Sequence, residues 1–150
     1  MSFDISTLVT DRTAADVSAI NDKGTYNASD LNRVGAAMAY LADRFAAQGY
    51  AVYVSPKTDW TAEDVLSASD VSKYLDDLAA LRAAFTVLST TPSVPEDMSG
   101  LTYQEANDIE KILEDIDTLL TNAVRAWFDC KRKNSRRLVR VKCLCQTIRV

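Results

Sequence analysis

Four pairs of adjacent acidic residues are the first groups in this chain that suggest chemistry, because paired carboxylates can serve acid–base catalysis or bind a cation. The pairs are Glu63/Asp64, Asp76/Asp77, Glu96/Asp97 and Glu114/Asp115. Neighbouring residues on a helix point about 100° apart, so the two carboxylates of a pair do not converge on one ligand. The chain also lacks the Asp-x-Asp-x-Asp-Gly loop that binds calcium. These pairs therefore predict solvated surfaces.

Nucleophilic catalysis and metal binding have little support in the sequence. The chain has no His, which excludes a Ser–His or Cys–His pair, and it has no Gly-rich phosphate loop. Its three cysteines, Cys130, Cys143 and Cys145, fall short of the four ligands of a structural zinc site. An odd number of cysteines without a signal peptide also argues against a disulfide framework. We therefore expect no catalytic residue, no metal, no cofactor and no enzymatic activity.

The segment Tyr-Asn-Ala-Ser-Asp-Leu-Asn-Arg-Val, residues 26–34, is the first candidate contact surface. Asn32 and Arg33 are expected to point away from the apolar positions of a helix, toward a partner or toward another loop. The alternative is that this segment caps a helix and forms a buried polar clamp, and we favour that interpretation. Tyr26, Asn32 and Arg33 are the candidate interaction residues here.

Trp60 is the second candidate, because it ends the polar loop segment Lys57-Thr-Asp-Trp60. Tryptophan is common at the centre of protein interfaces. The alternative is that Trp60 folds back and covers one end of the helical body, which is the interpretation that we favour.

Three long stretches have the three-and-four spacing of apolar residues that is typical of amphipathic helices. They predict helices at about 28–48, 69–88 and 103–128. The apolar positions are Leu31, Val34, Met38, Leu41 and Phe45 in the first, Val71, Tyr74, Leu75, Leu78, Leu81, Phe85 and Leu88 in the second, and Ile109, Ile112, Leu113, Ile116, Leu119, Leu120, Ala123 and Trp127 in the third. Each helix has a single apolar face, so we expect an all-α three-helix bundle with one shared core.

Capping residues mark the ends of these helices. Thr102 and Glu105 form a capping box, in which a hydroxyl and a carboxylate satisfy free amides reciprocally. The other expected N-caps are Thr13, for a short N-terminal helix that runs to about Asp22 and stops at Gly24, and Asn27 or Ser29 for the first long helix. The second long helix is expected to start near Ser69, with Asp70 in its first turn. Residues 50–54, Tyr-Ala-Val-Tyr-Val, predict a short extended segment.

Charge divides the chain into a helical domain, residues 1–128, and a basic tail, residues 129–150. The domain has nine Lys/Arg and twenty Asp/Glu, a net charge of −11, whereas the tail has eight Lys/Arg and one Asp, a net charge of +7. An acidic domain argues against nucleic acid as the main partner, because phosphate contacts need clustered cations. No run of about 18 apolar residues predicts a membrane span. Without a signal peptide, we expect the protein to stay in the cytoplasm.

The tail has two interpretations. In the first, the tail is a basic arm, with Arg136 and Arg137 as contacts for an acidic partner or nucleic acid. The alternating, β-branched sequence after Leu138 indicates a strand in this arm. Alternatively it is out of frame, because residues 135–141, Ser-Arg-Arg-Leu-Val-Arg-Val, can be encoded by a sequence that contains AAGGAGG, like a ribosome-binding site, followed by GTG.

Four segments of the chain resemble a known family in their order and spacing. They are residues 10–16, 24–34, 57–60 and 101–113. The chain is similar over about residues 8–128 to small helical proteins or modules encoded in bacteriophages and prophages of Gram-positive gut bacteria, which are usually described as virion structural or tail-associated proteins. Members of that family continue after the Trp-Phe pair with a short Gly-containing ending, whereas here Trp127-Phe128 is followed by the basic tail.

The resemblance implies a virion structural protein, associated with the tail or baseplate, that acts through protein–protein contacts. Its partners would be other phage structural proteins or itself, without a membrane, and with nucleic acid only through the tail. It would be located in the virion, and in the bacterial cytoplasm during assembly. The second hypothesis is a cytoplasmic helical adaptor or regulatory module whose basic tail binds nucleic acid or an acidic partner.

Overall fold

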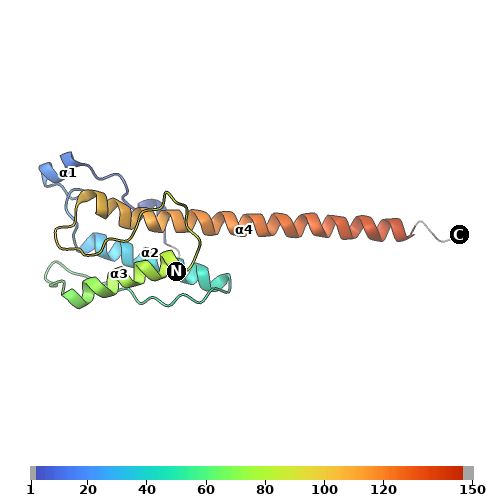
Figure 1. The fold of residues 1–150 in the computed structure, drawn as a ribbon, viewed down its shortest axis with the longest axis horizontal. Helices are drawn as coiled ribbons and strands as arrows, with labels where there is room; N and C mark the ends of the chain where they lie inside the picture. The colour runs from blue at the N-terminus through green and yellow to red at the C-terminus, as the bar shows by residue number, and fades with distance from the viewer. Residues whose placement is uncertain (1–2, 147–150) are drawn as a thin grey trace. The chain divides into compact units, whose positions relative to one another are not determined.

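The computed structural model describes the backbone of residues 3–146 and the side chains of residues 3–133. Within this part the protein is all-helical, as predicted, and contains no strand (Figure 1). A 3-10 helix, Ile5–Thr7, is followed by α1 (Ala14–Ala19), α2 (Ala28–Ala47), α3 (Ala68–Ala83) and α4 (Tyr103–Gln146). The chain divides into an N-terminal unit, Met1–Thr118, and a C-terminal unit, Leu119–Val150, and α4 contributes to both.

All four α-helices begin with the same two-way cap. The side chain of the residue before the helix accepts a hydrogen bond from the backbone N–H three residues later, or two residues later in the case of Asn27. In return, the carboxylate of the residue three positions later accepts a hydrogen bond from the backbone N–H of the capping residue. The pairs are Thr13/Asp16, Asn27/Asp30, Ser67/Asp70 and Thr102/Glu105. This confirms the caps at Thr13 and Thr102 and selects Asn27 over Ser29. The second long helix, expected to start near Ser69, starts one residue earlier at Ala68, with Ser67 as its N-cap and Asp70 in its first turn.

The ends of the helices differ more from the prediction. The short helix α1 stops at Ala19, where Ile20 takes a left-handed conformation with a φ of 49°. Helix α3 ends at Ala83, and Leu88, expected on its apolar face, is 55% exposed. Gly49 follows α2 with a φ of 84°, as the C-terminal glycine was expected to.

Helix α4 continues to Gln146, although we expected it to end at about residue 128. The chain has no Gly or Pro after Gly100, so no strong helix-stop residue follows, and Lys and Arg are good helix formers. The strand that the alternation after Leu138 indicated is therefore wrong for residues 138–146. Residues 147–150 lie outside the described residues.

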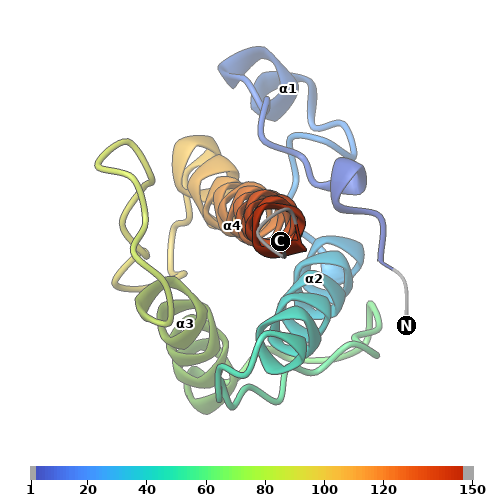
Figure 2. The same cartoon turned by 90° about the vertical axis from the view of Figure 1, so that its right-hand side faces the viewer.

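The core of the N-terminal unit lies among α2, α3 and the first part of α4. Helices α2 and α3 lie side by side, and the first turns of α4 run along α2 (Figures 1 and 2). The fully buried apolar side chains are Val34, Ala37, Met38, Leu41 and Phe45 of α2, Leu78 and Leu81 of α3, and Ile109, Ile112, Leu113 and Ile116 of α4. Residues 50–54, for which a short extended segment was expected, form neither a helix nor a strand. No helix in the described part of the chain is both long and apolar enough to cross a bilayer.

Candidate functional site

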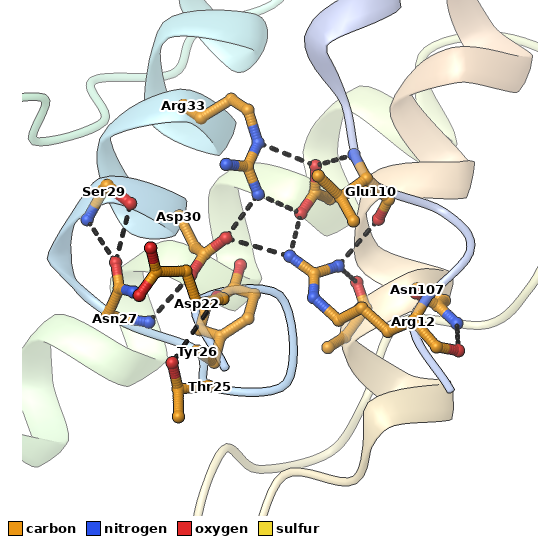
Figure 3. A network of polar contacts seen from close by, with 12 residues as sticks. Arg12, Asp22, Thr25, Tyr26, Asn27, Ser29, Asp30, Arg33, Asn107 and Glu110 are labelled. Atoms are coloured by element: carbon orange, nitrogen blue, oxygen red, sulfur yellow. Dashed lines mark hydrogen bonds and ion pairs between the residues drawn. The ribbon is translucent and has the colours of Figure 1, made fainter. Parts of the chain in front are cut away.

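Four charged side chains meet inside the N-terminal unit. Arg12 comes from the segment before α1, Asp30 and Arg33 come from the first turns of α2, and Glu110 comes from α4 (Figure 3). Glu110 is 0%, Asp30 4% and Arg12 5% exposed. We call these four residues the buried ion cluster. Burying an isolated charge is costly, so each of these groups needs partners of opposite charge.

The two guanidinium groups alternate with the two carboxylates. Arg12 Nη2 lies 2.9 Å from Asp30 Oδ1 and 2.7 Å from Glu110 Oε1. Arg33 donates to both oxygens of Glu110, from Nη2 at 2.7 Å and from Nε at 3.0 Å, and it also pairs with Asp30. Such two-point contacts are the strongest arrangement of Arg with a carboxylate. The formal charges of the cluster therefore cancel.

The cluster also fixes the N-terminal segment of the chain. The backbone N–H of Val9 donates to Glu110 Oε2 at 2.6 Å, and Arg12 Nη1 donates to the carbonyl of Val9 at 2.7 Å. The Arg12 guanidinium also lies over the Tyr26 ring, 5.5 Å from its centroid. Residues 9–12 are thus held against α2 and α4 although they form no helix themselves.

The ionisation of Arg33 and the burial of Glu110 fit a structural role for the cluster. Burial tends to lower the pKa of Arg33, but its hydrogen bonds and charge interactions with Glu110 and Asp30 raise that pKa above its ordinary value. Burial raises the pKa of Tyr26, whose hydroxyl lies 2.6 Å from that of Tyr74. A general acid or base must reach its substrate. Glu110 is fully buried, and its oxygens are occupied by Arg12, Arg33 and the Val9 amide.

Two asparagine side chains hold extended backbone in the same manner. Asn107 of α4 accepts from the Arg12 N–H at 2.9 Å and donates to the Arg12 carbonyl at 3.0 Å. Asn32 of α2 accepts from the Trp60 N–H at 2.7 Å and donates to the Trp60 carbonyl at 2.9 Å. Paired residues of neighbouring antiparallel strands exchange the same two bonds. We call these contacts the asparagine clamps.

Trp60 is folded back onto the N-terminal unit and is only 9% exposed. The ammonium of Lys57 lies 4.0 Å from the centroid of its ring. The loop packs closely on α2 at Gly35, where an added Cβ would lie 2.6 Å from the Lys57 carbonyl oxygen. A cavity of about 60 Å³ beside Trp60 and Tyr74 has room for a few water molecules, which is too small for most substrates.

The sequence-predicted residues of the N-terminal unit all engage their own chain. Tyr26 contacts Arg12 and Tyr74, Arg33 belongs to the buried ion cluster, and Asn32 is joined to Trp60 by an asparagine clamp. The contacts of Tyr26, Asn32 and Arg33 are those of a buried polar clamp, the interpretation that we favoured for residues 26–34. The low exposure of Trp60 likewise agrees with a side chain that folds back onto the helical body. Arg136 and Arg137 lie within α4, but their side chains are outside the described residues.

Sequence reasoning missed Arg12, Asn107 and Glu110. Glu110 had a detectable signal, because it lies four residues after Ala106 and three before Leu113, on the apolar face of α4. A carboxylate on such a face indicates a buried charge that needs a cation. Arg12 lies outside any periodic pattern, so nothing in the sequence identifies it as that cation.

A different kind of surface lies on α4 in the C-terminal unit. Trp127 is 52% and Phe128 53% exposed, and their rings meet edge-on with centroids 5.0 Å apart. Lys131 lies over the Trp127 ring at 3.9 Å, and Arg132 pairs with Asp129 at 2.8 Å. We call Arg125, Trp127, Phe128, Lys131 and Arg132 the aromatic–basic face. A hollow beside Phe128, lined also by Asp129 and the three cations of the face, has no opposite wall, because one helix supplies its whole lining, so it does not form a small-molecule pocket.

Helical spacing brings the members of this face together. Trp127 and Lys131 are four residues apart, and Phe128 lies three residues after Arg125 and four before Arg132, so the residues form two neighbouring rows. The predicted apolar stripe of this helix is buried only as far as Leu120, and Ala123 and Trp127 are exposed.

Comparisons of the chain with protein-family models, with curated proteins and with solved structures gave no match.

Proposed function

We propose that this chain is a structural protein that acts through protein–protein contacts, with the aromatic–basic face as its contact surface. The observation that carries the proposal is the pair of adjacent, half-exposed aromatic side chains, Trp127 and Phe128, surrounded by cations. Tryptophan, tyrosine and arginine are enriched among the residues that dominate binding energy at interfaces. A solvent-exposed tryptophan and phenylalanine on one helix are suited to insertion into an apolar pocket of a partner.

The N-terminal unit serves as the support in this proposal. Helices α2, α3 and the first part of α4 would form a three-helix bundle, and the buried ion cluster and the asparagine clamps fasten the N-terminal segment and the α2–α3 connection to it. Arg12, Asp30 and Glu110 are buried and contact one another, and Arg33, whose side chain is 20% exposed, completes the pairing. Such a unit fits a role in which shape and rigidity matter more than reaction chemistry, and we propose that the chain is not an enzyme.

The class of structural protein is suggested by the resemblance of residues 8–128 to virion proteins of phages and prophages. We propose a component of the tail or baseplate, present in the virion and, during assembly, in the cytoplasm of the bacterial host. Its partners would be other phage structural proteins or a second copy of itself. The aromatic–basic face spans the Trp-Phe pair, and its residues Lys131 and Arg132 lie after the point where this chain departs from that family.

Mass spectrometry of purified particles tests this function. The phage or prophage that encodes the chain is prepared with the wild-type gene, with Trp127→Ala/Phe128→Ala, and with the control Leu88→Ala, which truncates an exposed residue elsewhere. We expect the wild-type and control chains in the particles, and the double variant in the host cells but not in the particles. Absence of the wild-type chain from the particles would contradict the proposal.

The net charge of +7 in residues 129–150 favours one second candidate, a module that binds nucleic acid through its basic helix. Full-length protein and a chain ending at Phe128 separate the two functions. Nucleic-acid binding that is lost on truncation and that weakens steeply with salt would support the second candidate, whereas equal absence of binding in both proteins would reject it.

A further inference from the structure

We infer that the aromatic–basic face of one copy binds the α2–α3 connection of a second copy, so that the protein assembles head to tail. This inference rests on the proposed function, in which the face is a contact surface, and it names the partner. The connection concerned is residues 50–66, which we call the acidic loop.

Charge argues against pairing of two identical faces. The tail that carries Lys131 and Arg132 has a net charge of +7, so two such helices would repel each other when brought together. Residues 1–128 carry −11, so the basic face of one copy is complementary to the domain of another. Complementary potentials guide association and reject like-charged partners. The electrostatics therefore favour contact between unlike surfaces of two copies.

The acidic loop has the apolar groups that the aromatic rings need. Of the nine large apolar side chains exposed in the described residues, four lie in this loop, and only two others lie in the aromatic–basic face. The four are Tyr50 at 47%, Tyr53 at 89%, Val65 at 87% and Leu66 at 36%. Such a concentration of exposed apolar side chains is typical of a protein contact site.

The charges of the loop also match the face. The loop contains Asp59, Glu63 and Asp64 against the single cation Lys57, a net charge of −2. The face contains Arg125, Lys131 and Arg132, and with the neighbouring Asp129 its net charge is +2. The two surfaces are thus opposite in sign and similar in magnitude, and both combine charge with large apolar groups.

The acidic loop is held in place before any partner binds. Asn32 clamps the backbone of Trp60, and Asp64 accepts from the Thr61 N–H at 2.8 Å and pairs with Lys57 at 3.2 Å. A preorganised surface loses less conformational entropy on binding. The loop can therefore present Tyr53 and Val65 to a partner without first being ordered.

In an open assembly held by contacts between two different surfaces, one aromatic–basic face stays unused at one end and one acidic loop stays unused at the other. Copies can therefore keep adding until a ring closes or a filament grows. We expect the wild-type chain to form assemblies larger than dimers as its concentration rises, and we expect salt to weaken them because the surfaces are charged and exposed.

The test uses full-length protein in sedimentation velocity experiments with two complementary variants. The face variant is Trp127→Ala/Lys131→Glu, and the loop variant is Tyr53→Ala/Glu63→Lys. Each retains one intact surface, so we expect each alone to be monomeric and their mixture to form a one-to-one dimer that grows no further. For Trp127→Ala alone we expect the dissociation constant to rise by ~30-fold or more, as at an interface hot spot. Leu88→Ala is the matched control and should assemble like wild type.

Circular dichroism should show the same helicity for both variants as for wild type, because all four substituted side chains are exposed. A wild-type chain that stays monomeric at every concentration would overturn the inference, and so would monomeric protein that binds DNA instead. A discrete dimer that the face variant loses and the loop variant keeps would also overturn it, while the face would remain a contact surface. Conversely, head-to-tail assembly of a chain that is absent from particles would contradict only the proposed virion role.

Discussion

The N-terminal and C-terminal units differ in where they place tryptophan and charge. In the N-terminal unit Trp60 is buried, and Glu110 and Arg12 are buried and neutralised by each other and by their neighbours. In the C-terminal unit Trp127 is 52% exposed, and the ion pair of Arg132 with Asp129 lies at the surface. The same residue types therefore stabilise the fold in one region and are accessible to a partner in the other.

Because of this difference, substitutions in the two units should be detected by different measurements. Substitutions in the buried ion cluster or the asparagine clamps should lower the free energy of unfolding. Equivalent substitutions in the C-terminal unit should leave it nearly unchanged and affect association instead. A residue of the N-terminal unit and a matched residue of the C-terminal unit should therefore respond differently to the same kind of substitution.

Removal of a buried carboxylate should have the largest effect. Glu110→Ala leaves Arg12 and Arg33 with only Asp30 as a counter-charge, and loss of one partner of a buried ion pair costs about 3–5 kcal/mol. Urea denaturation followed by circular dichroism measures the change. Asp129→Ala, which breaks an exposed ion pair, should cost about 1 kcal/mol or less. Equal losses for the two variants would remove the contrast between the units.

The two tryptophans provide the second comparison. Trp60→Ala removes a residue that is only 9% exposed, and truncation of a buried aromatic residue costs about 3–5 kcal/mol. The cost is reduced here because the indole N–H has no hydrogen-bond partner among the described residues. Trp127→Ala, at a half-exposed position, should change the free energy of unfolding by about 1 kcal/mol or less. Thermal unfolding of both variants under the same conditions checks the difference. A large loss for Trp127→Ala would assign that residue to the fold.

The asparagine clamps should have an intermediate effect. Asn107→Ala removes both hydrogen bonds to the Arg12 backbone, which are part-buried, and we expect a cost of about 1–3 kcal/mol. Asn122→Ala, at an exposed position of the same helix, should stay within about 0.5 kcal/mol of wild type. Hydrogen exchange at the Arg12 amide gives an independent measurement, and unchanged protection in Asn107→Ala would contradict the role of the clamp.

The capping boxes should give the smallest effect and a defined pH dependence. Hydrogen bonds from the Ser67 side chain and backbone lower the pKa of Asp70 from 3.8, and those from Thr102 lower the pKa of Glu105 from 4.5. Because the folded pKa lies below the unfolded one, this stabilisation is complete above the unfolded value and is lost as the pH falls through the folded value. The free energy of unfolding should therefore decrease below about pH 4.5. Asp70→Asn should make this decrease shallower.

Much of the fold could be predicted because its signals are local. The starts of α1, α2 and α4 depend on capping residues three positions apart, and the buried faces on three-and-four spacing. The segment after α3 is held by groups farther along the chain, since Arg82 donates to the carbonyls of Pro92 and Thr91, and the Thr91 hydroxyl donates to Asp115. Such contacts have no local signal in the sequence. The three-helix bundle itself stays a prediction.

The buried ion cluster was less predictable because it joins distant positions. Asp30 and Arg33 are near neighbours in sequence, but Arg12 and Glu110 are 98 residues apart. No periodic pattern relates Arg12 to Glu110. Several other arginines could equally have been the partner of a carboxylate on the apolar face of α4. Trp127 was predicted as the end of a buried stripe, and its exposure depends on where the packed core ends, which helix periodicity alone does not specify.

The separation of Arg12 from Glu110 has a consequence for synthesis of the protein. The ribosome makes Arg12 early, but it must add 98 more residues before Glu110 exists. At ~5–20 residues per second, this takes roughly 5–20 seconds. During that time Arg12 has only Asp30 of its two counter-charges, so residues 9–12 cannot take their final place. Residues 9–12 should therefore dock no earlier than the part of α4 that carries Glu110, so the start of this unit is completed only after its end has been made.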